Sequence, residues 1–247
     1  MLRRFTEEFV LLTPGKGHFP DSFVLGSDGV APESEKPAVK ITFRASFALA
    51  RYEVTQELYE AIMGRTPSRW KGPRNSVEMV SWEEANDFCG KVTQELRRRK
   101  LLGEKEIIRL PSEAEWEYAC RAGTTSRYSF GDREEDLKDH AWFKGNSKGE
   151  DPPVGKKKPN AWGLYDMHGY VWEWCADAWQ PTHKGASIEG LPRVSATEKD
   201  RVLRGGSWAD PAEACRSASR QHKPLDYRSD TVGFRCVRAE VKEEGKK

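Results

Sequence analysis

The chain has 247 residues and a formal net charge of only +2, although 32% of its residues are charged. This balance argues against a protein that gathers nucleic acid or an anionic membrane through its overall field, because such binding depends on an excess of positive charge. No apolar stretch is long enough to span a membrane, and the first nine residues lack the apolar region of a secretory signal. We therefore expect a cytoplasmic protein that binds neither nucleic acid nor membrane, with its oligomeric state left open.

The composition also predicts one compact domain rich in turns. The sequence holds 21 Gly, 14 Pro and 9 Trp, so large flat side chains should fill much of the core. A buried Trp usually needs an acceptor for its ring N–H. Five cysteines are an odd number for the disulfide framework of a secreted protein, which favours reduced thiols.

Strands and turns are predicted for the first fifty residues. Residues 9–13, 22–26 and 39–47 carry β-favouring side chains between glycine and proline breaks.

Three helices with clear start signals should follow. Thr55 is placed to cap a helix that runs through Met63 and stops at Gly64. The other two begin with capping boxes, in which a serine is followed three residues later by a glutamate. These pairs are Ser81 with Glu84 and Ser112 with Glu115.

After Gly123 the sequence predicts short strands and long irregular loops. Residues 181–201 are expected to form an exposed insertion, and residues 241–247 a charged tail. A strand-rich opening, helices in the first half and a loop-rich second half indicate the α+β class.

The most informative segment is residues 201–236. Two adjacent glycines, Gly205 and Gly206, precede Ser207 and Trp208, which implies backbone angles or a close approach that a Cβ would block. Arginines recur at fixed offsets beside tryptophans and glycines. A guanidinium can bridge several carbonyls at once, so these arginines suggest a buried polar scaffold.

Three motifs together resemble the sulfatase-modifying-factor family, which includes the formylglycine-generating enzymes. They are LPSEAEWEY at residues 110–118, WGLYDMHGYVWEW at residues 162–174, and the segment from GGSW to GFRC at residues 205–236. The resemblance implies an irregular C-type-lectin-like fold over residues 20–238. Residues 1–20 would then be a lead-in strand and residues 239–247 a charged tail.

The resemblance also implies a copper site that this sequence does not match. In formylglycine-generating enzymes, two cysteines five positions apart follow the GGS motif and bind copper, and soft thiolates suit Cu(I). Here Asp210 stands where the first cysteine belongs if the register is anchored on Gly206 and Ser207. If it is anchored on residues 216–220, a short deletion removes the second ligand as well. On either register the pair is absent, so copper is not expected; Ser207 and Cys215 remain the candidate catalytic residues.

Calcium is expected from the same resemblance. Positions matching Asp166, Gly169, Val171 and Glu173 supply side-chain and backbone oxygens to calcium in relatives, and Ca²⁺ prefers such mixed oxygen ligands. The alternative is that Asp166 and Glu173 cap turns and pair with arginines.

A thiol pair is the third feature that the resemblance implies. Cys89 and Cys236 match positions that form a disulfide in some members, or they are two thiols in proximity. His168 is expected to make a structural hydrogen bond.

Two functions follow from these observations. One is a non-copper member of the family that binds a peptide or protein, such as a sulfatase, through its C-terminal loops. The other is an oxidase that converts a sulfatase cysteine to formylglycine. The candidate ligand-binding residues are Trp208, Asp210, Arg216, Arg220, His222, Tyr227 and Arg228.

Overall fold

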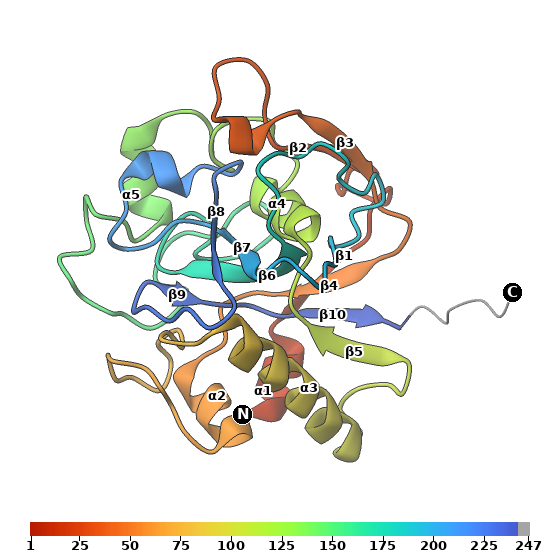
Figure 1. Cartoon of the computed structure of the whole chain (residues 1–247). Coiled ribbons are helices and arrows are strands. Elements are labelled where there is room, and N and C mark those ends of the chain that lie inside the picture. Colours follow the sequence, from red (N-terminus) through yellow and green to blue (C-terminus); the bar gives the residue numbers. More distant parts are fainter. Residues whose placement is uncertain (242–247) are drawn as a thin grey trace, which may run out of the picture.

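A four-stranded antiparallel sheet crosses the middle of the molecule and combines the first strand of the chain with the last (Figure 1). In order, its strands are β1 (Phe9–Leu12), β4 (Phe47–Ala50), β10 (Val237–Glu240) and β5 (Glu106–Arg109). Phe9 lies opposite Ala50 in β1 and β4, and Val237 lies opposite Leu49 in β10 and β4. The structure is a computed structural model that describes residues 1–241.

This sheet separates two hydrophobic cores. On one side lie α1 (Leu2–Glu7), α2 (Gln56–Met63) and α3 (Trp82–Arg98), which appear together below the sheet in Figure 1. Their buried side chains, such as Tyr59 and Phe88, pack with Ile108 of β5. On the other side α4 (Glu113–Arg121) packs Trp116 and Tyr118 among side chains from β1, β4 and β10. Large aromatic side chains therefore fill both cores, as the composition predicts.

All three predicted helix starts are confirmed, and in two of them the capping side chain makes its hydrogen bonds. Ser81 and Ser112 each form a complete capping box with Glu84 and Glu115. Helix α2 ends at Gly64, whose φ of 74° is left-handed, but Thr55 makes no side-chain cap hydrogen bond. Thr55 instead forms a backbone bridge with Ser76.

A second four-stranded sheet carries the motif-rich half of the chain. Its order is β8 (Arg220–Pro224), β7 (Asp200–Arg204), β6 (Trp172–Ala178) and β9 (Val232–Gly233), with β9 parallel to β6. A separate hairpin pairs β2 (Ser22–Leu25) with β3 (Val39–Thr42). The remaining elements are the short helices η1 (Glu33–Glu35), η2 (Glu134–Asp136), α5 (Leu137–His140) and η3 (Ala212–Cys215).

Several segments differ from the sequence-based expectation. The first twenty residues form α1 as well as β1, because Leu2 and Phe5 are buried against α2 and α3. Residues 39–47 are not one strand, since β3 ends at Thr42 and β4 starts at Phe47. Within residues 181–201, His183 is buried, so this segment is not wholly exposed.

The expected charged tail begins inside β10, where residues 239 and 240 pair with β5. Residues 242–247 of that tail lie outside the described residues. Helices and largely antiparallel strands mix in one unit, which confirms the α+β class at that level. Within residues 1–241, no helix combines the length and apolar character needed to cross a membrane.

Candidate functional site

The turn that follows β7 requires glycine at two successive positions. Gly205 and Gly206 have φ angles of 103° and 80°, a region that side chains disfavour. A Cβ on Gly206 would also lie 2.7 Å from Cys215 Sγ and 3.0 Å from the Ala214 carbonyl oxygen. This confirms the conformation predicted from the sequence and brings η3 directly against the turn.

Ser207 and Asp210 form a hydrogen-bonded pair at the end of this turn. The Ser207 hydroxyl donates to Asp210 Oδ2, and the indole Nε1 of Trp172 in β6 donates to the same oxygen at 2.8 Å. Ser207 is buried and Asp210 is partly exposed. Asp210 Oδ1 has no hydrogen-bond partner among residues 1–241, so this oxygen is available to a ligand.

Cys215 lies beneath the same turn, as a buried thiol. Burial raises its pKa, with a further contribution from the negative charge of Asp210. Its Sγ is 3.8 Å from the carbonyl oxygen of Pro211. A thiol rather than a thiolate is a weak nucleophile and a poor metal ligand. Which of the two registers relates Asp210 and Cys215 to the copper-binding cysteines stays a prediction.

Trp208 is partly exposed and is fixed by hydrogen bonds at both ends. Its backbone N–H donates to the Tyr170 carbonyl at 2.9 Å, and its indole Nε1 donates to the Asp230 carbonyl at 3.1 Å. The Asp230 carboxylate in turn pairs with Arg69 at 2.9 Å, and the Arg69 guanidinium lies 5.1 Å from the centre of the Trp70 ring. We call Trp208, Asp230, Arg69 and Trp70 the tryptophan rim.

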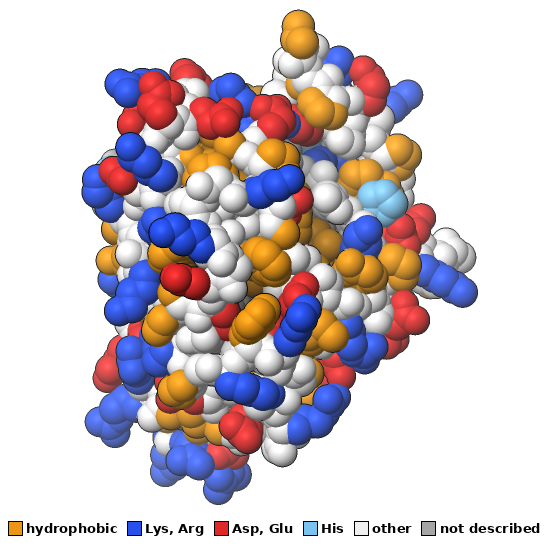
Figure 2. All heavy atoms as spheres, turned by 90° about the vertical axis from the view of Figure 1, so that its left-hand side faces the viewer, with side chains coloured by type: hydrophobic (Ala, Val, Ile, Leu, Met, Phe, Trp, Pro, Cys, Tyr) orange, Lys and Arg blue, Asp and Glu red, His pale blue; other side chains and the backbone are white. Residues whose placement is uncertain are grey.

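Arg69, Trp70 and Asp230 were not predicted as site residues. The face that Figure 2 shows carries α5 and β9, and hydrophobic side chains gather near its middle among many charged ones. Trp70 retains 36% exposure, a large value for tryptophan. Partly exposed tryptophans beside arginine are typical of recognition surfaces.

Glu78 supports the Trp70 end of this rim from below. Its Oε1 accepts a hydrogen bond from the Trp70 backbone N–H at 3.1 Å, while its Oε2 is buried without a partner. Burial raises the pKa of Glu78 to about 7, although the Trp70 and Arg69 backbone hydrogen bonds oppose the rise. Asp151 and Asp230 add to the rise through their negative charge.

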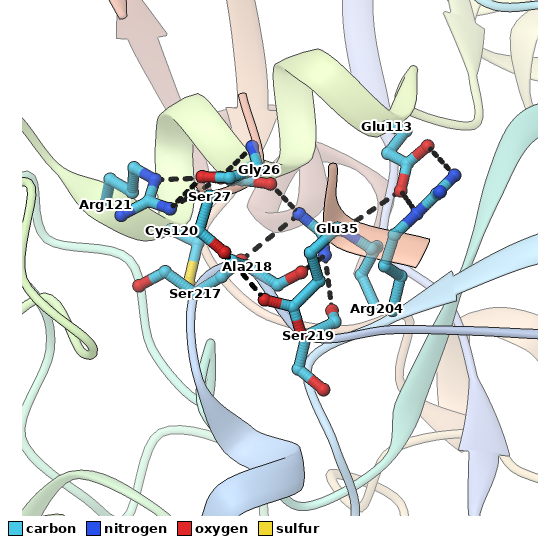
Figure 3. A network of polar contacts seen from close by, with 12 residues as sticks. Gly26, Ser27, Glu35, Glu113, Cys120, Arg121, Arg204, Ser217, Ala218 and Ser219 are labelled. Atoms are coloured by element: carbon cyan, nitrogen blue, oxygen red, sulfur yellow. Dashed lines mark hydrogen bonds and ion pairs between the residues drawn. The ribbon is translucent and has the colours of Figure 1, made fainter. Parts of the chain in front are cut away.

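Two of the predicted ligand-binding arginines belong to a buried ion-pair network (Figure 3). Arg220 donates twice to Glu113 at 2.7 Å, and Arg216 donates to Glu35 at 2.7 and 2.9 Å. At the centre, Arg204 pairs with Glu117 and donates to the carbonyls of residues 217–219. This confirms the expected arginine scaffold. The predicted role of Arg216 and Arg220 in ligand binding stays a prediction.

The other predicted residues lie on β8 and the loop that follows it. His222 Nδ1 is 2.5 Å from Asp200 Oδ2, and its ring stacks on Trp179 at 4.3 Å. Tyr227 lies 5.0 Å from the Lys223 ammonium, and Arg228 donates to Glu84 at 2.9 Å. Among residues 1–241, none of these three forms a hydrogen bond or ion pair with Ser207 or Asp210.

One of the predicted calcium residues, Glu173, is paired with the buried Arg235. Both oxygens of Glu173 accept from Arg235 at 2.6 Å, and Oε2 also accepts from Trp116 Nε1 at 2.8 Å. Glu173 in this state does not fit a calcium ligand, because its oxygens already face donors. Asp166 fits better, since its Oδ1 is buried without a partner and burial raises its pKa to about 6.

No group of three or more His, Cys, Asp or Glu side chains within residues 1–241 is arranged to hold a metal ion. Backbone oxygens of Gly169 and Val171 would have to complete the calcium set. Calcium therefore stays a prediction.

The two paired thiols and His168 have structural settings. Cys89 Sγ and Cys236 Sγ lie 3.9 Å apart, and both are buried; whether they are bonded in the protein stays a prediction. His168 accepts from the Ser129 backbone N–H at 3.0 Å and lies 2.9 Å from the Cys215 carbonyl oxygen. Burial lowers its pKa to about 4, so His168 is neutral and links the Cys215 segment to residue 129.

Comparison with known protein families shows which family the chain belongs to. Residues 3–240 match the family described as Sulfatase-modifying factor enzyme 1-like domain. The chain belongs to this family. It is 33% identical over 180 residues to the formylglycine-generating enzyme of Bos taurus, an alignment that covers 67% of the chain and 44% of the relative.

Two further relatives show how varied the family is. A Mus musculus protein called inactive C-alpha-formylglycine-generating enzyme 2 is 34% identical over 185 residues, covering 67% of the chain and 51% of that protein. The structure of PvdO from Pseudomonas aeruginosa superposes with a TM-score of 0.81 and 29% identity, covering 94% of both chains. The chain spans about half the length of the curated relatives it matches.

Proposed function

We propose that this chain is a sulfatase-modifying-factor domain that works without copper and binds a peptide or protein through its C-terminal loops. The observation that carries the proposal is the Asp210 carboxylate, held by Ser207 and Trp172 where the resemblance places the first copper-binding cysteine. A carboxylate is a hard ligand and a poor replacement for a thiolate on Cu(I).

The state of Cys215 supports the same conclusion. Cys215 packs against this turn, it is fully buried, and its raised pKa keeps it protonated near neutral pH. Metal binding would have to remove that proton and open the packing against Gly206. Two thiolates on Cu(I) are therefore not available at this turn.

The loops around Trp208 have the properties of a recognition surface. Hydrogen bonds to Tyr170 and Asp230 fix Trp208, which lowers the entropy that a ligand would have to remove on binding. Beside Trp208, Asp210 Oδ1 offers a hydrogen-bond acceptor. Tyr227 and Arg228 are close in sequence to Asp230, whose carbonyl accepts from the Trp208 indole. The lectin-like fold that the resemblance implies would present such loops on a rigid base.

The comparisons support a domain that exists with and without oxidase activity. Relatives of similar identity carry the names formylglycine-generating enzyme and inactive C-alpha-formylglycine-generating enzyme 2. A sulfatase is accordingly one partner to test. The alternative function, oxidation of a sulfatase cysteine to formylglycine, is favoured by the presence of Ser207 and by Cys215, which packs against the neighbouring Gly206.

Binding and turnover of one cysteine peptide separate the two functions. A fluorescent peptide with a sulfatase-type cysteine motif is incubated with the protein after copper loading, and mass spectrometry follows conversion of the thiol to an aldehyde. We expect no conversion. Conversion that depends on Cys215, and that C215S abolishes, would establish the oxidase instead.

The same labelled peptide measures binding by fluorescence anisotropy. We expect W208A to weaken any measured affinity about tenfold, since truncating an interface tryptophan often costs more than 1 kcal/mol. The matched control is W142A, which removes another partly exposed tryptophan whose ring contacts Lys157 rather than a predicted ligand-binding residue. Equal loss in both variants, or none in W208A, would reject Trp208 as the anchor.

A further inference from the structure

A cavity lies beside the β2–β3 hairpin, away from the Ser207 turn. It has a volume of about 680 Å³, and it is lined by β2, the start of β3 and the loop that follows α4. Figure 1 shows this hairpin close to α4. Ser207, Trp208 and Asp210 do not line the cavity, so it is separate from the site described above.

One wall of the cavity is the outer edge of β2. Thr42 of β3 donates its backbone N–H to the Ile188 carbonyl at 2.8 Å, so this N–H points away from β2. Thr42 lies opposite Ser22. In an antiparallel pair, opposite residues either bond to each other or both point away. The backbone groups of Ser22 therefore point outward, and those of Val24 and Gly26 do the same because the pattern repeats every second residue.

Gly26 confirms this orientation. Its N–H donates to Glu117 Oε1 at 2.9 Å, and its carbonyl accepts from Arg121 Nη2 at 3.2 Å. Both partners are side chains of α4, and Figure 3 shows Arg121 beside Gly26. Two side chains thus take the place of a neighbouring strand at this end of the edge.

The rest of the edge has no such cover. Ser22 and Val24 have no outward backbone hydrogen bond among the described residues 1–241, and Val24 is 46% exposed. Unpaired N–H and C=O groups along a strand are a template for another strand. Extended peptides use such edges, with main-chain bonds for affinity and pockets for alternate side chains.

The floor and the rim of the cavity indicate which peptide fits. Phe23 and Tyr118 meet edge to face at 5.4 Å and both line the cavity, which gives an apolar side chain an aromatic contact. Four lining side chains are cationic and two are acidic: Lys40, Arg121, Arg127 and Arg216, against Asp28 and Asp132. The three arginines already form ion pairs, Arg121 with Glu117, Arg127 with Glu213 and Arg216 with Glu35, so Lys40 is the one unpaired cation among these lining residues.

Lys40 is the cation best placed to select charge. It lies opposite Val24 in the hairpin, on the solvent face, and forms no ion pair with any described residue. The two acids already accept from backbone N–H groups, Asp28 from Ala38 at 2.9 Å and Asp132 from Arg127 at 2.8 Å. An acidic side chain on the solvent face of an added strand would therefore be favoured beside Lys40.

We propose that an extended polypeptide segment with an acidic side chain beside Lys40 binds in this cavity as an added strand. Its main chain pairs with Ser22 and Val24, an apolar side chain packs on Phe23 and Tyr118, and its acidic side chains face Lys40. This interaction does not use Ser207, Trp208 or Asp210, and it shares only Arg216 with the ligand-binding residues predicted above.

The experiment uses the full chain and a labelled peptide of sequence SEVEFEVES, whose glutamates and apolar residues alternate. Binding is measured by fluorescence anisotropy, and amide exchange by NMR. We expect saturable binding and slower exchange of the Ser22 and Val24 amides. V24P removes the outward N–H, which an edge strand tolerates, and should weaken binding about tenfold or more. K40E should weaken it several-fold, with the largest effect at low salt.

Two controls separate strand pairing from other effects. V30P places proline at an exposed valine that does not line the cavity and should leave binding unchanged, and circular dichroism checks that each variant is folded. The peptide SEVPFPVES, whose prolines remove two N–H groups that would face β2, should bind at least tenfold more weakly than SEVQFQVES, which carries the same charge. Absence of binding at millimolar peptide, binding insensitive to V24P, or occupation by laurate but not by the peptide would each overturn the proposal.

Discussion

The buried carboxyl of Glu78 makes stability depend on pH in a way that one substitution should remove. Glu78 is 1% exposed, its Oε2 has no hydrogen-bond partner, and burial raises its pKa from 4.5 to about 7. A carboxyl whose folded pKa is raised binds its proton more tightly in the folded state. Stability from this group is therefore highest at low pH and is lost as pH rises between about 4.5 and 7.

The magnitude follows from the two pKa values. Each pKa unit corresponds to about 1.4 kcal/mol, so the carboxyl costs about 3 kcal/mol once it is ionised in the folded state. Between pH 5 and pH 8 the change is about 2–3 kcal/mol. E78Q removes the ionisation while keeping the shape, so its stability relative to wild type should increase by that amount over this range.

Urea unfolding followed by tryptophan fluorescence at pH 5, 6.5 and 8 measures the difference. Comparing the two proteins at each pH cancels the contributions of other groups, such as His168. E83Q, which removes an exposed carboxylate close by in sequence, controls for the change in net charge. A difference between E78Q and wild type that is the same at all three pH values would refute the reasoning.

Four further results are expected. R235M leaves Glu173 buried without its partner and should lower the free energy of unfolding in urea by about 3–5 kcal/mol. Adding E173Q to R235M should recover part of this loss. An unchanged midpoint of urea unfolding in R235M would contradict the buried pair. G206A should cost about 2–4 kcal/mol, from its left-handed φ and its contact with Cys215 Sγ, seen as a lower Tm. All five cysteines are buried, so Ellman's reagent should react with none in the native protein; rapid reaction of any thiol argues against that burial. Finally, the calcium prediction requires that millimolar Ca²⁺ raise the Tm of wild type and not of D166N, with EDTA as the reference; equal Tm values would count against it.

Features set by a few neighbouring residues were predictable from the sequence. The capping boxes at Ser81 and Ser112 depend only on residues three positions apart, and both form. The positive φ angles at Gly205 and Gly206 could be predicted from the glycine pair itself. The arginine scaffold was predictable in kind, because arginines beside tryptophans need several acceptors when buried.

Features set by distant pairs were not predictable. Trp172 and Asp210 are 38 residues apart and meet because β6 and the turn after β7 are adjacent. The tryptophan rim joins Arg69 to Asp230 across 161 residues. Helix α1 was missed because its signal is only two buried apolar residues, Leu2 and Phe5, among charged ones. Arg69 and Trp70 are adjacent in the sequence, and this pair was the one local signal that could have indicated the tryptophan rim.

Binding of Cu(I) tests the central claim most directly. The protein is titrated against a chromophoric Cu(I) chelator, in wild type and in D210C, which restores a cysteine five positions before Cys215. We expect wild type to leave the copper on the chelator, and D210C to compete for it. Stoichiometric, tight binding of Cu(I) by the wild-type protein would contradict the claim that this domain works without copper.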